Sequence, residues 1–242
     1  MPEGPSLIII KENISQFIGC KIIAASGYAA INYSLLEQKK IIDIQTWGKH
    51  LFICLKDINI EIHLRMFGSY LINNRKPKII AKLSLQFAKE ELNFYVVDVK
   101  LINDISIYDK EVDVMSEEWN EAKAIKKLKE YPKVKICDAL LDQQIFAGVG
   151  NIIKNEVLWR VKLHPETIVE NITPAQLKKL MKEVVVYPFE FLKYRKEGTL
   201  AKHWNAYNQK TCSRCNNKII KSYLGKGKRA SFFCVYCQIL KK

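Results

Sequence analysis

Two groups of residues, one near each end of the sequence, have the types and spacing to do chemistry. Near the start, Pro2 is followed by Glu3, so removal of Met1 leaves a secondary amine beside a carboxylate. A free α-amino group has a pKa of roughly 7.7 to 8.0, so a usable fraction is unprotonated at neutral pH. Such a nitrogen adds to a sugar aldehyde and gives an iminium ion, as in Schiff-base enzymes. A proline at this position also simply sets N-terminal processing, and on Pro2 alone that interpretation is preferred; features elsewhere in the chain reverse the preference.

The second group consists of four cysteines in two CxxC pairs, Cys212 with Cys215 and Cys234 with Cys237. Each pair can place two thiolates on one tetrahedral zinc ion. Two redox motifs are the alternative, but the βαβ context of a thioredoxin-like site is missing. Four thiolates leave no position for water, so the pattern predicts one structural zinc ion without a hydrolytic role. The other cysteines stand singly among apolar residues and are expected to be buried thiols: Cys20, Cys54 and Cys137.

Two further segments have the character of phosphate-binding sites. Lys226–Arg229 lies between the cysteine pairs, at the expected tip of a zinc-stiffened hairpin, where basic side chains can contact phosphate. Gly148–Asn151 combines a glycine-rich turn with the start of a helix, whose N–H groups and dipole favour an anion such as a DNA phosphate. A solvated charge run and a tight helix connection are the alternative explanations.

Lys49 follows Trp47 and Gly48 and directly precedes a strand-like run that begins at Leu51. Its ammonium is therefore expected at the start of a strand and outside the core, where a single lysine can also be ordinary surface. His50 and His63 are expected to be hydrogen-bonded structural residues, because neither has a second His or Cys at metal-ligand spacing.

The segment Arg65, Met66, Phe67 and Gly68 ends a strand-like run with a long flexible side chain and an aromatic ring beside a glycine. Such side chains can fill the gap that an extruded base leaves in a duplex. Packing of Met66 and Phe67 in the core is an equally reasonable interpretation of the sequence.

The composition favours a polyanionic partner. The 242 residues carry a formal net charge of +14, and the sequence pI is about 9.4. Nucleic acid is the usual partner of so basic a chain, and a membrane surface is the other candidate. No apolar run approaches the roughly 20 residues that a membrane span needs, so we expect a soluble, intracellular protein.

The hydrophobic periodicity changes twice along the chain, and together with the cysteine pairs it divides the chain into three parts. Residues 1–112 are expected to form a β-rich domain, because period-two alternation is clear over 58–65 and 83–87. Residues 113–205 are expected to form a helical domain. Residues 206–242 are expected to form the zinc-bound hairpin.

Helical spacing marks the first and second of these domains. It predicts helices over 6–17, 137–145 and 151–161, the last two joined by a glycine-rich turn. Another helix is expected to begin after Thr173, which is an N-cap candidate with Pro174 at N1 and Gln176 at N3.

Taken together and in this order, these motifs resemble the formamidopyrimidine-DNA glycosylase and endonuclease VIII family over essentially the whole chain. The segments that carry the resemblance are Met1–Pro5, Trp47–His50, His63–Gly68, Leu141–Gln144, Gly148–Asn151 and the CxxC pairs. The resemblance implies a multidomain α+β fold: an N-terminal β-sandwich with flanking helices, a helix-two-turn-helix module and a zinc-bound β-hairpin. It also implies a bifunctional DNA glycosylase and AP lyase of base-excision repair.

The resemblance assigns roles to residues of this chain. Pro2 corresponds to the nucleophile that attacks C1′, and Glu3 to the group that moves protons to the sugar oxygen and the departing base. Lys49 matches a lysine that contacts phosphate near the lesion and assists proton transfer. Asn151 and Arg229 match residues that bind phosphates around the flipped nucleotide. The implied partner is damaged DNA, bound by a monomer near the nucleoid without a small-molecule cofactor or a membrane.

Three departures from the family pattern bear on the substrate. Ser6 stands where a second glutamate is usual, and Gly4 replaces the leucine typical of formamidopyrimidine-DNA glycosylases. Their arginine-phenylalanine loop has no match within residues 95–110. The missing loop and Gly4 favour the endonuclease VIII-like branch and oxidised pyrimidines. Ser6 puts in doubt a contact of that carboxylate with the damaged base, but not the Pro2 chemistry.

Two other functional classes remain open from the sequence. The chain can be a non-catalytic zinc-finger protein that recognises damaged or structured DNA. It can also be a basic protein associated with RNA or ribosomes, for which the zinc hairpin and the charge suffice and the Pro2-Glu3 start is coincidence.

Overall fold

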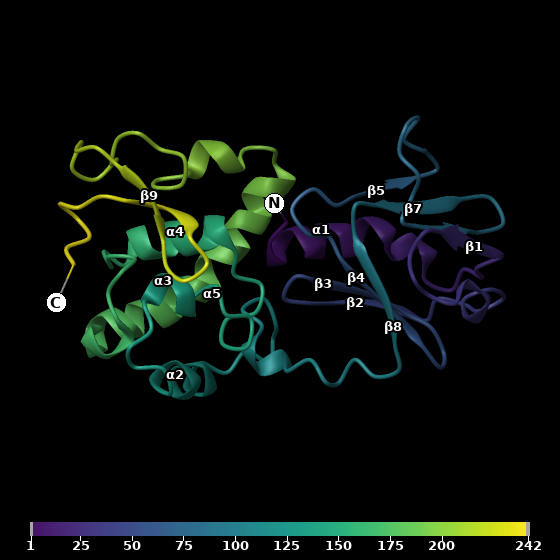
Figure 1. Cartoon of the computed structure of the whole chain (residues 1–242), viewed down its shortest axis with the longest axis horizontal. Coiled ribbons are helices and arrows are strands. Elements are labelled where there is room, and N and C mark those ends of the chain that lie inside the picture. The colour runs from purple at the N-terminus through teal and green to yellow at the C-terminus, as the bar shows by residue number, and fades with distance from the viewer. Residues whose placement is uncertain (1, 241–242) are drawn as a thin grey trace. The chain divides into compact units, whose positions relative to one another are not determined.

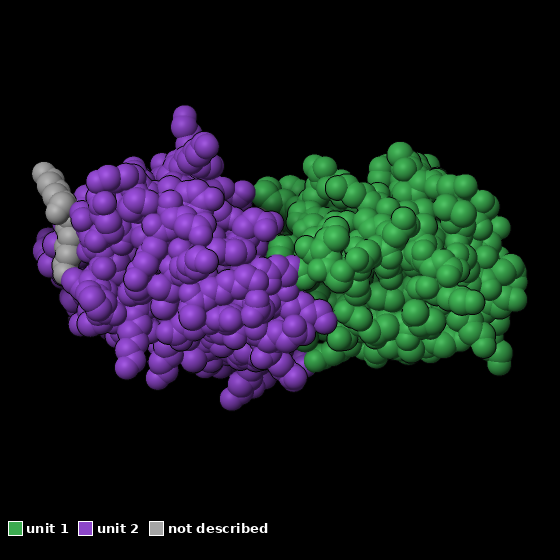
Figure 2. All heavy atoms as spheres, turned by 90° about the horizontal axis from the view of Figure 1, so that it is seen from below, with its two compact units in different colours: residues 1–2, 6–108 green, residues 3–5, 109–242 purple. Residues whose placement is uncertain are grey.

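The computed structural model describes residues 2–240, which divide into two compact units (Figures 1 and 2). The first unit contains Pro2 together with Ser6–Tyr108, and the second contains Glu3–Pro5 and the chain from Asp109 onward. Three residues near the start of the sequence therefore pack with the C-terminal part of the chain. Met1, whose removal the Pro2 hypothesis requires, lies outside the described residues.

The first unit is a β-sandwich of two antiparallel four-stranded sheets, with strand orders β2-β3-β4-β8 and β1-β6-β7-β5. The strands are β1 (Ala24–Gly27), β2 (Asp43–Trp47), β3 (His50–Cys54), β4 (Asn59–His63), β5 (Ser69–Ile72), β6 (Leu83–Gln86), β7 (Glu91–Tyr95) and β8 (Asp98–Ile102). Apolar side chains from the inner faces of both sheets form one core. This confirms the predicted β-sandwich.

Both faces of the sheet that contains β4 are covered. Leu51 and Ile62 are adjacent in the register of β3 and β4 and lie fully buried in the sandwich core, as the alternation predicted. On the opposite face, however, Glu61 is only 6% exposed and Phe52 only 1%. The ring of Tyr108 lies against that face, with its centroid 4.9 Å from that of Phe52. The polar positions of this strand are therefore largely removed from solvent.

Helix α1 (Gly4–Ile14) and the short 3₁₀ helix Ser15–Phe17 pack against the sandwich. Leu7 and Ile14 are completely buried in its core. The helix begins at Gly4, two residues before the start that the periodicity indicated, because Pro5 is compatible with the first turn of a helix.

The second unit is helical up to about residue 203. Its α-helices are α2 (Glu121–Lys129), α3 (Ile136–Ala139), α4 (Asn151–Arg160) and α5 (Pro174–Lys196). The capping box predicted for α5 is present, since Thr173 and Gln176 each bond the other's backbone N–H through a side-chain oxygen. The helix expected over 137–145 is wrong in length: only α3 forms. The Asp142 side chain accepts the N–H of Gln144, which favours a turn over a continued helix.

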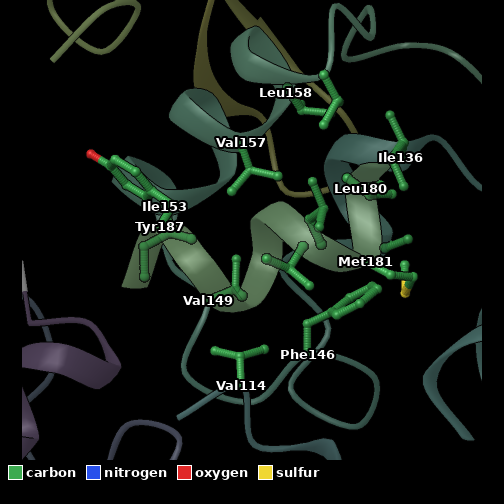
Figure 3. Packing of buried hydrophobic residues seen from close by; sticks show 14 of the residues in the cluster. Val114, Ile136, Phe146, Val149, Ile153, Val157, Leu158, Leu180, Met181 and Tyr187 are labelled. Atoms are coloured by element: carbon green, nitrogen blue, oxygen red, sulfur yellow. The ribbon is translucent and has the colours of Figure 1, made fainter. Parts of the chain in front are cut away.

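Figure 3 shows side chains of α3, α4 and α5 meeting in the core of this unit, among them Ile136, Val157 and Leu180. Val149, from the glycine-rich turn, is completely buried in the same core. The turn that precedes α4 is therefore anchored by its own apolar residue. Among residues 2–240, no helix has both the length and the apolar character needed to cross a membrane.

The second unit ends in an antiparallel hairpin of β9 (Ile220–Leu224) and β10 (Arg229–Phe233). Strand β10 packs on α4 (Figure 1). The preceding chain is fixed by Glu156 of α4, whose buried carboxylate accepts the backbone N–H groups of Asn205, Ala206 and Tyr207. Helix α4 thus positions both the hairpin and the segment that leads into it.

Candidate functional site

Glu3 is completely buried, and its carboxylate lies at the N-terminus of α4. Oε1 accepts the backbone N–H of Ile152 at 2.7 Å, and Oε2 accepts those of Gly150 and Ile153 at 3.1 Å each. A helix N-terminus presents unsatisfied N–H groups and the positive end of the dipole, so it stabilises a negative charge there. These bonds fix the residue that directly follows Pro2 in the chain.

The anion at this helix N-terminus is not the one that the sequence suggested. We expected a DNA phosphate to meet the N–H groups of the glycine-rich turn, but Glu3 accepts the N–H of Gly150 and two that follow it. Gly150 is required because a Cβ there would lie 2.3 Å from Cδ of Glu3. Since 147 residues separate Glu3 from Gly150, no local pattern reveals this contact.

Gln143 holds the glycine-rich turn from its other side. Its Oε1 accepts the N–H of Gly148 at 3.0 Å, and its Nε2 donates to the carbonyl of Val149 at 3.1 Å. The N–H of Gly4 in turn donates to the carbonyl of Gly148 at 2.9 Å. Sequence reasoning gave Gln143 no role, although its position just before a glycine turn was a usable signal.

Asn151 is the first residue of α4 and is 5% exposed. Its Oδ1 atom is buried and has no hydrogen-bond partner in the described part of the chain. Buried polar atoms without a partner are rare in folded proteins, and each needs an explanation. The Asn151 amide has an oxygen that accepts and an NH2 group that donates, so a ligand at the start of α4 can form a hydrogen bond with either.

Arg229 is the first residue of β10, directly after the hairpin turn. The turn is held by Asp138 of α3, whose carboxylate accepts the N–H of Lys226 at 2.9 and 3.0 Å. Gly225 leaves room for this contact, because a Cβ there would lie 2.2 Å from Oδ1 of Asp138. The basic turn lies where the sequence placed it, and α3 fixes it.

Lys49 lies in the two-residue turn between β2 and β3, next to Gly48, whose φ of +53° suits glycine. This is the strand-start position that the sequence predicted. Lys49 belongs to the first unit, as does Pro2, whereas Glu3, Asn151 and Arg229 belong to the second.

Arg65, Met66 and Phe67 occupy the turn between β4 and β5. Phe67 is 75% exposed and Met66 is 50% exposed, so neither side chain packs in the core. Arg65 donates from Nε to Oδ2 of Asp98 at 2.5 Å, and this hydrogen bond lowers the pKa of Asp98. Gly68 closes the turn through its N–H bond to the carbonyl of Leu64 at 2.8 Å.

A partly buried polar cluster beside this turn was not anticipated. His50 Nδ1 lies 2.7 Å from Oε1 of Glu61, and a pocket of about 230 Å³ is lined by these two residues with His63, Asp98 and Lys100. Burial lowers the pKa of both histidines, although Glu61 opposes this at His50. The lowered pKa values favour the neutral form of both imidazoles.

Tyr108 shares the Glu61 carboxylate, and burial together with this contact raises the pKa of its hydroxyl to about 12. Glu61 was missed because period-two alternation places it on the apparent solvent face of β4. That His50 is hydrogen-bonded agrees with expectation.

The four paired cysteines come together, with their Sγ atoms all within 4.8 Å of one another. Cys212 and Cys234 are completely buried. The indole of Trp159 donates to Sγ of Cys212 at 3.4 Å, which orients one thiolate from α4. This donor set fits a tetrahedral zinc ion, and the predicted cluster is confirmed as a group able to hold a metal.

The other three cysteines, Cys20, Cys54 and Cys137, lie outside this cluster. Burial raises the pKa of Cys54 and of Cys137 to about 11 each, so neither is a ready thiolate nucleophile. Both are buried as expected, whereas Cys20 is partly exposed.

Comparison with known proteins gives the family. Residues 1–102 match the sequence model of the formamidopyrimidine-DNA glycosylase N-terminal domain, and residues 111–195 match that of its H2TH domain. The chain is 30% identical to the formamidopyrimidine-DNA glycosylase of Streptococcus pyogenes serotype M6 over 98% of both chains. The chain belongs to the formamidopyrimidine-DNA glycosylase and endonuclease VIII family. This is a family of DNA glycosylases for the repair of oxidised bases.

Other members of the family resemble this chain in part or in whole. Endonuclease 8-like 3 of Xenopus laevis is 34% identical over 90% of this chain, which corresponds to 38% of that protein. The Homo sapiens protein of the same name is 33% identical over 98% of the chain and 42% of its own length. The chain thus spans about two fifths of the length of these relatives.

A solved structure of a family member matches nearly the whole chain. It is the Lactococcus lactis formamidopyrimidine-DNA glycosylase bound non-covalently to DNA that contains an AP site. The TM-score is 0.87 at 26% identity, and the match covers 98% of this chain and 99% of that one. A second structure of this glycosylase is of a complex with DNA containing an oxidised pyrimidine.

Proposed function

We propose that this chain is a bifunctional DNA glycosylase and AP lyase that acts through the nitrogen of Pro2. The observation that carries the proposal is the fully buried Glu3, held by three backbone N–H groups of α4. These bonds hold the backbone directly beside Pro2 in place. Family membership supplies the substrate class, damaged DNA.

The proposed chemistry begins with attack of the Pro2 nitrogen on C1′ of the damaged nucleotide. The C1′–N bond to the base breaks, and the base leaves with the bonding electrons and takes up a proton. The attached nitrogen loses its N–H proton and so regains a lone pair. The sugar ring then opens as its O4′ is protonated, and this lone pair forms the iminium double bond to C1′. Removal of Met1 is required, because an acylated nitrogen has no available lone pair.

The iminium also accounts for strand cleavage. It acidifies the C2′ protons, so loss of one expels the 3′ phosphate by β-elimination, and a second elimination expels the 5′ phosphate. Water finally releases the sugar fragment and regenerates the amine. Base excision and cleavage thus share one intermediate, which explains why a single nucleophile suffices.

Glu3 is proposed to move protons during base loss. Both of its oxygens accept N–H groups of α4, so the helix fixes the position of the carboxylate from which a proton would pass. Replacement with glutamine keeps the size but removes the base. We expect Glu3→Gln to impair base excision more than cleavage of a preformed abasic site, and equal losses in both assays would contradict this assignment.

DNA is proposed to bind through phosphate contacts from Lys49, Asn151 and Arg229. Asn151 supports this role through its place as the first residue of α4, where its side-chain NH2 group can donate to a phosphate oxygen, and Arg229 through its place at the fixed hairpin turn. With a net charge of +14, affinity should fall steeply with salt as counterions are released. The exposed Phe67 and Met66 are proposed to fill the space of the extruded base.

The zinc ion is proposed to be structural and to stiffen the hairpin that carries Arg229, since the four thiolates leave no site for water. Oxidised pyrimidines are proposed as preferred substrates, on the basis of Gly4 and the missing arginine-phenylalanine segment within residues 95–110. A panel of single lesions in one duplex sequence tests this preference.

Reduction by borohydride in the presence of abasic-site DNA tests the proposed function. An iminium intermediate is reduced to a stable amine, so the enzyme becomes covalently attached to the strand. We expect a protein–DNA adduct with processed protein, and a weaker one with Pro2→Gly, whose primary amine still forms an imine. DNA binding without any adduct or cleavage would instead support a non-catalytic damage-recognition protein.

A further inference from the structure

Lys154 is a buried cation that the chemistry above does not use. It lies in the second turn of α4 and is 1% exposed. Its ammonium donates to Oγ of Ser231 at 2.9 Å and to the carbonyl of Ala230 at 3.2 Å, both on β10. A buried charge is costly unless it is paired or hydrogen-bonded, so a buried lysine at this position requires an explanation.

The contacts of Lys154 link the two residues proposed to bind phosphate. Asn151 precedes Lys154 by three positions, so the two side chains share one side of α4. Arg229 immediately precedes Ala230, whose carbonyl Lys154 binds. A displacement of β10 along α4 would therefore change the distance between Asn151 and Arg229 directly.

The neighbouring Asn155 shows that this edge of β10 is matched specifically to α4. Its Nδ2 donates to the carbonyl of Ala230 at 3.2 Å, and its Oδ1 accepts the N–H of Phe232 at 2.7 Å. The amide thus replaces a neighbouring strand at the edge that β9 does not cover. Asn155 sets the register of β10, and Lys154 adds a second, charged attachment at the same carbonyl.

We propose that Lys154 is a positioning residue for DNA binding, which fastens β10 to α4 so that Arg229 and Asn151 bind the DNA backbone together. The inference rests on the proposed function. It assigns the fixed geometry of the hairpin to a contact outside the cysteine cluster, so a zinc ion alone does not place Arg229.

The electrostatic surroundings of Lys154 agree with this role. Burial lowers its pKa to about 8, with Arg229 acting in the same direction, while Cys137, Asp138 and Glu3 oppose the decrease. At neutral pH the ammonium form therefore still predominates. The positive charges of Lys154 and Arg229 interact electrostatically, so a phosphate that binds Arg229 would also be attracted by Lys154.

Lys154→Met tests the proposal, because methionine fills similar space but cannot donate a hydrogen bond. The matched control is Lys179→Met, which removes the same charge from an exposed position on α5. The probe is a duplex with a tetrahydrofuran abasic analogue for affinity, and a duplex with a natural abasic site for single-turnover cleavage at saturating enzyme.

We expect Lys154→Met to raise the Kd about tenfold, since a hydrogen bond to a charged group is worth about that factor. The saturated cleavage rate should change less than about twofold, because no reacting atom is touched. Lys179→Met should leave both values near wild type. In an Arg229→Ala background, Lys154→Met should add less than about twofold, since the residue it positions is gone.

Two results would overturn the proposal. One is a Kd of Lys154→Met equal to that of Lys179→Met. The other is a double variant, Lys154→Met with Arg229→Ala, whose Kd is raised by the full product of the two single effects. If Lys154→Met does not fold, as judged by zinc content and thermal midpoint, Ser231→Ala removes one acceptor and should raise the Kd about threefold. An unchanged Kd would then overturn it. Wild-type protein that binds the tetrahydrofuran duplex but does not cleave the natural abasic site would contradict the proposed function and leave the role of Lys154 in binding untouched.

Discussion

Replacing Gly150 with alanine tests whether Glu3 is held by the first turn of α4. A Cβ at this position would lie 2.3 Å from Cδ and 2.4 Å from Cγ of Glu3, well inside contact distance. The backbone itself imposes no penalty, because φ of −119° and ψ of −163° at Gly150 are open to any residue. The whole effect of the substitution must therefore come from displacing the Glu3 side chain.

The size of the effect follows from the three hydrogen bonds that displacement breaks. Each buried donor left without its acceptor costs about 1 to 3 kcal/mol, and water that enters recovers part of this. We therefore expect Gly150→Ala to lower the free energy of unfolding of the second unit by about 3 kcal/mol. Glu3→Ala removes the same three bonds and should cost a similar amount.

The decisive measurement is the free energy of unfolding of the double variant, Glu3→Ala with Gly150→Ala. If the Cβ acts only by expelling the Glu3 side chain, Gly150→Ala costs less than about 0.5 kcal/mol once Glu3 is alanine. Urea denaturation followed by tryptophan fluorescence measures this, because the second unit contains Trp119, Trp159 and Trp204. Additive losses of about 6 kcal/mol in the double variant would instead show that the Cβ at position 150 acts on something other than the Glu3 side chain.

A matched control is Gly227→Ala, at a position where a Cβ would lie 3.6 Å from its nearest neighbour, Cγ of Arg229. This is an ordinary contact, so the stability should stay within about 0.5 kcal/mol of wild type. A large loss at Gly227 would show that the assay responds to any glycine replacement in this unit.

Three further predictions concern other parts of the chain. Phe67→Ala should leave the thermal midpoint unchanged, because the ring is 75% exposed, and should slow base excision from duplex DNA about tenfold in single-turnover assays, since a stacking contact is worth about 1 to 3 kcal/mol; a lowered midpoint would indicate a core role. Metal analysis should find one zinc ion per chain, and its removal by a chelator, or Cys215→Ser, should abolish DNA binding while the β-sheet circular dichroism persists; unaffected binding would contradict the structural role. Burial lowers the pKa of Lys154 to about 8 from a reference value of 10.5, so between these pH values the unfolded chain binds more protons than the folded chain. The free energy of unfolding should therefore rise with pH across that window, by up to about 3 kcal/mol more in wild type than in Lys154→Met. Equal slopes of the two proteins in urea titrations at several pH values would count against this prediction.

The sequence predicted the features that depend on local chemistry. The capping box at Thr173 and Gln176 is confirmed, because both partners lie within one turn of α5. The cysteine pairs are also confirmed as one cluster, since each CxxC spacing already restricts its two thiolates to one ion. The strand alternation placed Ile60 and Ile62 correctly in the core.

Contacts between distant segments could not be derived in this way. Nothing near Glu3 in the sequence indicates that its carboxylate meets a helix that begins at Asn151. Glu61 looked solvent-facing because its burial depends on Tyr108, which follows it by nearly fifty residues. Lys154 has helical neighbours of mixed character, and only the packing of β10 on α4 reveals that it is buried. Each of these requires knowledge of which segments pack together.

Peptide sequencing by mass spectrometry of the borohydride-reduced complex identifies the nitrogen that attacks C1′. We expect the residual sugar mass on the nitrogen of Pro2, in chains that lack Met1. Attachment to the side chain of Lys49 or another lysine, with Pro2 unmodified, would contradict it.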